Sequence, residues 1–208
     1  MPKKEVPVDH LQHYLPPGTS AAVTGYLRQY KVHLTVTKHR KSILGDYRHR
    51  THDRNHRISV NGSLNSFSFL ITLLHELAHL LTFEQHGNKI PAHGKEWKTI
   101  YGQLLQQFLE HNIFPADIEK ELLLSLKNPA ASSCAEEGLL RVLRKYDAKE
   151  NNHRLIEEIP FNTLFRLDDG RVFQKGEKLR KRFKCKEVAT GKLYLFSPVY
   201  EVEEVVSH

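Results

Sequence analysis

The segment HELAHLLTFEQHGNKIPAHGKEW, residues 75–97, begins with a histidine pair at helical spacing and then carries two further histidines. His75 and His79 stand four residues apart, and residues at that spacing lie on one face of an α-helix. Two neutral imidazoles can therefore face one ion, while Glu76 points toward a water molecule beside it. This H-E-x-x-H pattern is typical of catalytic zinc sites in which the glutamate acts as a base.

A catalytic zinc site keeps three protein ligands and one open position, so one further ligand is needed. His86 stands seven residues after His79, which places it about 10 Å further along the same helix. That is too far for a nitrogen that must lie about 2.0–2.1 Å from the ion. Gln85 occupies the position at which one large class of zinc proteases has its third histidine, so that class is disfavoured. We expect His86 to lie beside the site or at the rim of the cleft.

Two residues beyond the helix remain as candidates for the third ligand. His93 follows a turn that contains Gly87 and Pro91, and this turn can fold the chain back toward the first two histidines. Glu96 could instead act as the glutamate ligand that another class of zinc protease uses. We expect His93 to complete the site and keep Glu96 as the alternative.

The sequence on both sides of this motif shows helical or strand periodicity. The motif helix, expected over about 65–86, carries a stripe of leucines that should face the core: Leu70, Leu73, Leu74, Leu77 and Leu81. The other expected elements are helices near 19–30, 95–110, 116–126 and 138–146, and strands at 32–37, within 38–50 and at 56–62. Ser133 and Glu136 form an S-x-x-E capping box ahead of the last helix.

From Pro160 onward the pattern changes to short alternating runs separated by turn signals such as Asp-Asp-Gly and Thr-Gly. Such runs predict a β-meander or a small barrel. We therefore expect an α+β protein with two domains, residues 1–150 and a small basic β module at 151–208.

Composition restricts the class of protein. The chain has 208 residues, of which 39% are hydrophobic and 26% charged, as in ordinary soluble proteins. The longest apolar run, 67–81, contains His75, Glu76 and His79, so we expect no membrane span. Cys134 and Cys185 are the only cysteines, which argues against a disulfide framework and for a cytoplasmic protein.

Basic charge is concentrated in two segments. The net charge is +7, and residues 28–57 contain nine Lys or Arg against two Asp, while 175–186 contain seven against one Glu. Clustered basic charge is expected of a protein that binds nucleic acid, although a solvated basic surface gives the same pattern. The candidate contacts to DNA are Arg48, Arg50, Arg54, Arg57, Arg180, Lys181, Arg182 and Lys184.

Three short stretches together resemble a known family. ISVNGSL (58–64), LLHELAHLL (73–81) and HGKEWK (93–98) are similar to the SprT-like zinc metalloproteases, which include the Spartan proteases that degrade proteins crosslinked to DNA. The resemblance covers roughly residues 20–110. It implies a minimal zincin with one Zn²⁺ held by His75, His79 and His93, and with Glu76 as the catalytic base.

The C-terminal module departs from that family. Many SprT-like proteins carry a zinc ribbon with two C-x-x-C pairs, but here Val188 stands where a partner for Cys185 would be needed. We therefore expect a ribbon-like β module without metal, and one zinc per chain.

The sequence thus predicts a zinc-dependent metalloendopeptidase that acts on proteins or peptides, including DNA-associated ones. The strand HRISVNG (56–62) is expected at the edge of the cleft, where an extended substrate could pair with it. Tyr101, Arg57 and His86 are all candidates for stabilising the oxyanion. Two other functions fit the same residues: a non-catalytic nucleic-acid-binding or regulatory protein with a structural zinc, and a zinc hydrolase that cleaves another kind of bond.

Overall fold

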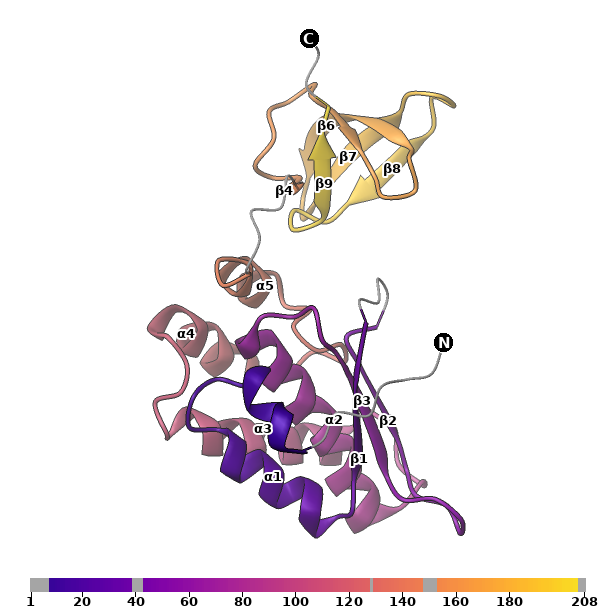
Figure 1. Cartoon of the computed structure of the whole chain (residues 1–208). Coiled ribbons are helices and arrows are strands. Elements are labelled where there is room, and N and C mark those ends of the chain that lie inside the picture. Colours follow the sequence, from indigo (N-terminus) through magenta and orange to yellow (C-terminus); the bar gives the residue numbers. More distant parts are fainter. Residues whose placement is uncertain (1–7, 39–42, 128, 148–152, 206–208) are drawn as a thin grey trace. The chain divides into compact units, whose positions relative to one another are not determined.

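The computed structural model describes residues 8–38, 43–127, 129–147 and 153–205 (Figure 1). The chain divides into two compact units, residues 1–147 and 148–208. The expected boundary at 150/151 falls among residues 148–152, which lie outside the described residues. The first unit contains helices and a three-stranded sheet, and the second contains a six-stranded sheet. The α+β class expected from the sequence is therefore confirmed.

The first unit contains the helices and a small sheet. Its elements are a 3-10 helix η1 (Val8–His13), α1 (Ser20–Gln29), β1 (His33–Thr37), β2 (Gly45–Arg48), β3 (Arg57–Asn61), α2 (Ser66–His86), α3 (Lys95–Leu109), α4 (Ala116–Ser125) and α5 (Glu137–Arg144).

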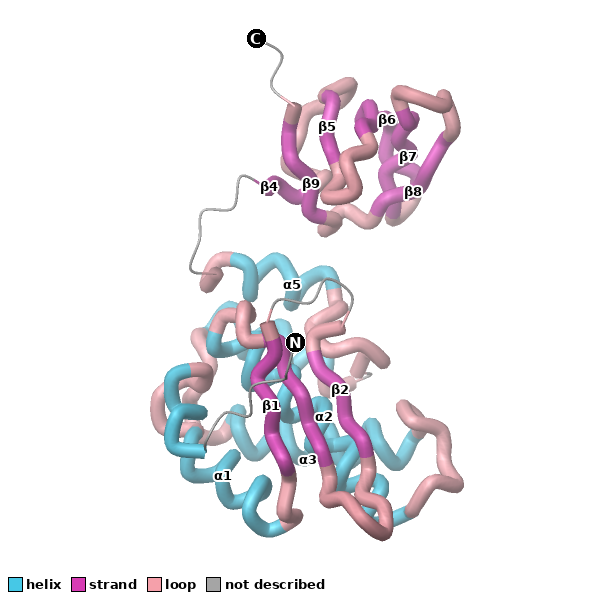
Figure 2. Tube along the Cα trace, turned by 45° about the vertical axis from the view of Figure 1, so that its right-hand side comes forward, coloured by secondary structure: helices cyan, strands magenta, loops and turns pink. Residues whose placement is uncertain are grey.

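The three strands of this unit form a sheet in the order β1-β3-β2, with β1 parallel and β2 antiparallel to β3. Helices α2 and α3 lie behind the sheet (Figure 2). The expectation that HRISVNG forms the edge of the cleft is therefore wrong, because β3 has a partner on both sides. Its four residues from Ile58 to Asn61 are all buried, as is typical of a central strand. The edge beside α2 is β2.

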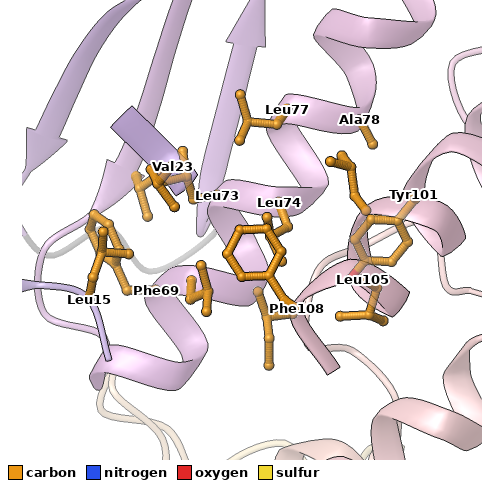
Figure 3. Close-up of a cluster of buried hydrophobic side chains, with 14 of the residues drawn as sticks. Leu15, Val23, Phe69, Leu73, Leu74, Leu77, Ala78, Tyr101, Leu105 and Phe108 are labelled. Carbon is orange, nitrogen blue, oxygen red and sulfur yellow. The ribbon is translucent and has the colours of Figure 1, made fainter. Parts of the chain in front are cut away.

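Helix α2 is the core element of the first unit. Asn65 caps its start, because the side-chain oxygen accepts a hydrogen bond of 2.9 Å from the Ser68 N–H. Four leucines of the predicted stripe are fully buried, whereas Leu81 is half-buried. Figure 3 shows side chains of α2 meeting those of α1 and α3, including Val23 and Phe108.

The length and composition of α2 alone would allow it to cross a membrane, in spite of the histidines and glutamate in it. However, 72% of its most apolar window is buried inside the protein. A core helix of a globular domain meets the same criteria, and this is the position that α2 has in the first unit.

The predicted capping box at the start of α5 is not formed. The N-cap is Glu136, and no side chain caps the helix. The Glu136 carboxylate instead accepts hydrogen bonds from Ser125 Oγ at 2.7 Å and from the Ala130 N–H at 3.1 Å. These bonds hold the loop 129–136 against α4, and the buried Cys134 in this loop lies 4.0 Å from Thr72 Oγ1 of α2. Tertiary contacts have therefore replaced the local cap.

The second unit is a six-stranded antiparallel sheet. Its strands are β4 (His153–Leu155), β5 (Leu164–Arg166), β6 (Val172–Leu179), β7 (Arg182–Glu187), β8 (Leu193–Phe196) and β9 (Glu201–Glu204), in the order β4-β9-β5-β6-β7-β8. Cys185 is fully buried in a core that includes Phe165, Phe173 and Val202. This module therefore has an apolar core of its own.

Candidate metal centre

Three histidines from two parts of the chain meet in the first unit. His75 and His79 project from α2, and His93 lies in the connection to α3. Their nearest nitrogen atoms all lie within 4.8 Å of one another, and His75 Nε2 is 3.3 Å from His93 Nε2. A tetrahedral ion with nitrogen ligands at about 2.0–2.1 Å sets those nitrogens about 3.3–3.4 Å apart. The three side chains could therefore hold a metal ion, and the 3.3 Å pair has the spacing of two ligands of one ion.

The connection between α2 and α3 brings His93 into this position. Gly87 ends α2 with φ +67°, a left-handed conformation that favours glycine, and its N–H donates to the Phe83 carbonyl. A tight turn closes at Gly94, whose N–H donates to the Pro91 carbonyl at 3.0 Å. The chain reverses here, so that α3 packs against α2.

Trp97 of α3 supports the three histidines from below. Its fully buried ring lies 4.6 Å from that of His75, 5.3 Å from that of His79 and 4.8 Å from that of His93, measured between centroids. Tyr101 stacks on the indole at 5.0 Å. Trp97 is thus the aromatic residue that packs against all three imidazoles.

The other sequence candidates for the third ligand lie outside the group. Gln85 and His86 are exposed in the last turn of α2, and His86 does not line the cleft described below. Glu96 is half-buried in the first turn of α3 and is not part of the histidine group. The geometry gathers His93 and not Glu96.

The surroundings keep the imidazoles neutral, which is the form that binds a metal. Burial, followed by the neighbouring imidazoles, lowers the pKa of His75 to about 3. Burial and His93 lower the pKa of His79 to about 4. The pKa of His93 is also lowered, mainly by burial and then by Lys98. Nδ1 of His75 is buried without a hydrogen-bond partner among the described residues, so Nε2 is the nitrogen aimed at the group.

Glu76 lies beside the histidines under strand β2. Its side chain is buried, with 6% of its surface exposed. Strand β2 passes so close at Gly45 that a Cβ there would lie 2.5 Å from Glu76 Oε1 and 2.7 Å from Thr72 Cγ2. Gly45 is the first residue of β2, and only a residue without a side chain fits there.

A cleft of about 550 Å³ opens over the histidines and Glu76. Its three walls are Ile43–Tyr47, Gly87–His93 and Ala131–Ser133. None of the three residues proposed for the oxyanion lines this cleft: Tyr101, Arg57 and His86 all lie elsewhere. Tyr47 and the segment 131–133 could not be predicted as parts of the site, because no spacing pattern links either of them to the H-E-x-x-H motif.

The predicted DNA contacts fall into two groups, one in each unit. In the first, Arg48 pairs with Asp46 at 3.0 Å and Arg50 with Glu84 at 3.2 Å, while a shallow pocket gathers Arg50, Arg54 and Arg57. In the second, the β6–β7 hairpin carries Arg180, Lys181, Arg182 and Lys184 at or beside its turn. Lys184 lies 3.6 Å from Glu177.

The long core helix with two histidines and a glutamate, joined by a third histidine from the following turn, defines an α+β domain with a candidate metal centre. The model of the SprT-like family matches residues 19–119, which include all four side chains. The matched segment, residues 19–119, is therefore SprT-like, and the resemblance seen in the sequence is confirmed over this segment. Searches of curated proteins and of solved structures found no match.

Proposed function

We propose that this protein is a zinc-dependent metalloendopeptidase. The observation that carries the proposal is the group of three neutral histidines at zinc-ligand spacing, with a buried glutamate beside it, at the base of an open cleft. The match of residues 19–119 to the SprT-like family supports the same function.

His75, His79 and His93 would hold the ion. A bound zinc would lower the pKa of a water molecule and polarise the carbonyl of the peptide bond. Glu76 then takes a proton from the attacking water and passes it to the leaving amine. Gly45 leaves the space that the carboxylate occupies, because a Cβ at residue 45 would lie 2.5 Å from Glu76 Oε1.

Strand β2 offers a place for an extended substrate. It pairs with β3 on one side only, and residues 43–47 form a wall of the cleft. A peptide that adds to such an edge gains main-chain hydrogen bonds, and its alternate side chains point into the cleft. We assign to β2 the role that the sequence suggested for HRISVNG.

The rival function, a binding protein with a structural zinc, fits the geometry less well. Structural zinc sites are closed by four protein ligands. In the part of the chain that the structure describes, the candidate group has three members and opens onto a cleft. A structural site would also have no need of Glu76.

Metal content and cleavage measured on the same sample test the proposal. We expect one zinc per chain and cleavage of an unfolded protein such as casein. Phenanthroline should abolish the cleavage and added zinc should restore it. Mass spectrometry of the products identifies the broken bond, which separates a peptidase from a hydrolase of another class. A zinc-loaded protein that leaves casein, short peptides and DNA-bound proteins intact would contradict the proposal.

We further propose that the β6–β7 hairpin contacts DNA and so brings the peptidase to DNA-associated proteins. Arg180 and Lys181 form its turn and are exposed, as is Arg182. No ion pair of these three is found among the described residues, whereas Arg48 and Arg50 each contact a carboxylate. A cationic side chain that is not already paired with a carboxylate can contact a phosphate without first breaking an ion pair.

Changing Arg180, Lys181 and Arg182 together to alanine should weaken DNA binding and reduce its salt dependence. Each duplex phosphate that the variant no longer neutralises makes the slope of log K against log salt shallower by about 0.9. The measurement is a titration of labelled duplex at several salt concentrations. A control of equal charge changes three arginines that contact carboxylates in the same unit: Arg154, Arg166 and Arg171. Equal losses in both variants would assign the effect to net charge instead of the hairpin.

A further inference from the structure

The ring of Tyr47 lies near two histidine rings at the wall of the cleft. It is nearly parallel to the ring of His79, at 4° and 6.4 Å between centroids, and to the ring of His56, at 18° and 5.9 Å. Strand β2 explains this position. Gly45 and Tyr47 are two residues apart and face the same way, so the strand that sets Gly45 against Glu76 sets Tyr47 beside His79.

His56 fixes the direction of the Tyr47 hydroxyl. It is buried, with 2% of its surface exposed, and its Nδ1 lies 2.9 Å from Tyr47 Oη and 3.3 Å from the backbone nitrogen of Arg50. A backbone N–H can only donate, so Nδ1 must be an acceptor. The ring proton is then on Nε2, which faces Glu84 Oε1 at 3.3 Å. Tyr47 therefore donates its hydroxyl hydrogen to His56.

We propose that Tyr47 is a further catalytic residue, whose hydroxyl donates a hydrogen bond to the oxyanion that forms when the peptide carbonyl is attacked. This inference rests on the proposed peptidase function. It fills the role for which the sequence offered Tyr101, Arg57 and His86, none of which lines the cleft.

The contacts of Tyr47 allow the hydroxyl hydrogen to turn without movement of the ring. His56 Nδ1 lies 2.9 Å from the hydroxyl oxygen, so rotation about the C–O bond is enough to redirect the hydrogen away from His56. When the hydrogen turns to the oxyanion, His56 Nδ1 keeps the Arg50 N–H as its donor. A hydrogen bond to an anion is roughly twice as strong as one between neutral groups, which favours the turn only while the negative charge is present.

The step balances without any added reagent. The water oxygen bonds to the carbonyl carbon, the carbonyl π electrons move to its oxygen, and Glu76 takes the water proton. Tyr47 keeps its proton throughout and supplies a hydrogen bond alone. When the C–N bond breaks, Glu76 gives the proton to the leaving amine. Among the other cleft residues, Thr82 already donates its hydroxyl to the Ala78 carbonyl.

The experiment compares Tyr47→Phe with Tyr101→Phe. Both variants lose one phenolic oxygen from a ring packed against a histidine of the group, but Tyr101 lies outside the cleft. Loss of an oxyanion donor typically lowers kcat by about 10²–10³. We expect that loss in Tyr47→Phe, with zinc content and KM little changed, and a kcat near that of the parent in Tyr101→Phe.

A second measurement does not depend on turnover. A phosphinic peptide, in which an anionic phosphinate replaces the scissile amide, mimics the attacked carbonyl. Its affinity for the zinc-loaded protein should fall by about tenfold or more in Tyr47→Phe. The affinity of the matching uncharged peptide, measured on Glu76→Gln with and without the Tyr47 change, should stay the same.

The outcomes separate this inference from the proposed function. If the parent cleaves peptides and Tyr47→Phe matches it in kcat and in phosphinic-peptide affinity, the hydroxyl role is wrong and the peptidase stands. Loss of zinc from Tyr47→Phe would also overturn the hydroxyl role, since Tyr47 would then be needed to keep the metal bound. A parent that neither cleaves peptides nor binds the phosphinic peptide would end both proposals.

Discussion

We expect Glu76→Gln to abolish the proposed peptide cleavage and to leave zinc bound. The glutamine amide has nearly the size of the carboxylate, so it fits the space beside Gly45. That space is tight, because a methyl group added at residue 45 would collide with the side chain of residue 76. It cannot accept a proton from the attacking water, and loss of a general base costs about 10²–10⁴ in rate. The three histidines keep their positions, because Glu76 is not part of the group that holds the ion. The measurements are kcat, zinc content and the melting temperature of parent and variant.

Glu96→Gln is the matched control for this change. It also neutralises one glutamate near the histidines, but in the first turn of α3 and outside the cleft. We expect it to keep both its zinc and its activity. Parental rates in Glu76→Gln would show that another group takes the proton, and equal losses in both variants would point to a general effect of charge.

His93→Ala should greatly weaken zinc binding. Two ligands would remain, both on α2, and a pair of imidazoles holds zinc far less tightly than three. Changes in residues that only support a ligand already cost about 10–100-fold in affinity, so the loss of a ligand itself should exceed that range. His93 is half-buried at the cleft, so we expect the fold to be kept. Competition with a chelator of known affinity measures the loss.

His86→Ala provides the comparison for His93→Ala. His86 is exposed in the last turn of α2 and lies outside the histidine group, so its removal should not change the zinc affinity. Full zinc occupancy in His93→Ala would mean that another side chain is the third ligand, and Glu96 would be the first candidate to test.

The parts of this structure that depend on local sequence could be predicted from the sequence. The leucine stripe and the cap at Asn65 mark α2, and Gly87 marks its end, so the positions of His75, Glu76 and His79 on one helix follow from spacing alone. The return of His93 could also be expected, because Gly87 and Pro91 allow the chain to reverse there.

The parts that depend on contacts between distant segments could not be predicted. Nothing in the sequence of β3 shows that it would be paired on both sides. Because β3 is the central strand, β2 and not β3 is the edge strand at the cleft. Tyr47 meets His56 through the pairing of β2 with β3 and meets His79 through the packing of β2 on α2, and neither contact follows from local sequence. The spacing of Glu136 from Ser133 predicted a capping box, but the Glu136 carboxylate instead accepts hydrogen bonds from Ser125 and Ala130.

The loop 129–136 and α5 also set the limits of an independently folding fragment. The family match ends at residue 119, yet Ala131–Ser133 form one wall of the cleft, and Leu139 and Leu143 are buried in the core of the first unit. Asn65, the cap of α2, donates to the Leu143 carbonyl at 3.0 Å and to Asp147 Oδ1 at 2.7 Å. A chain shortened at residue 119 would keep all four side chains of the candidate site and still expose apolar surface that promotes aggregation. The smallest self-sufficient fragment therefore extends to Asp147, well past the segment that the family model matches.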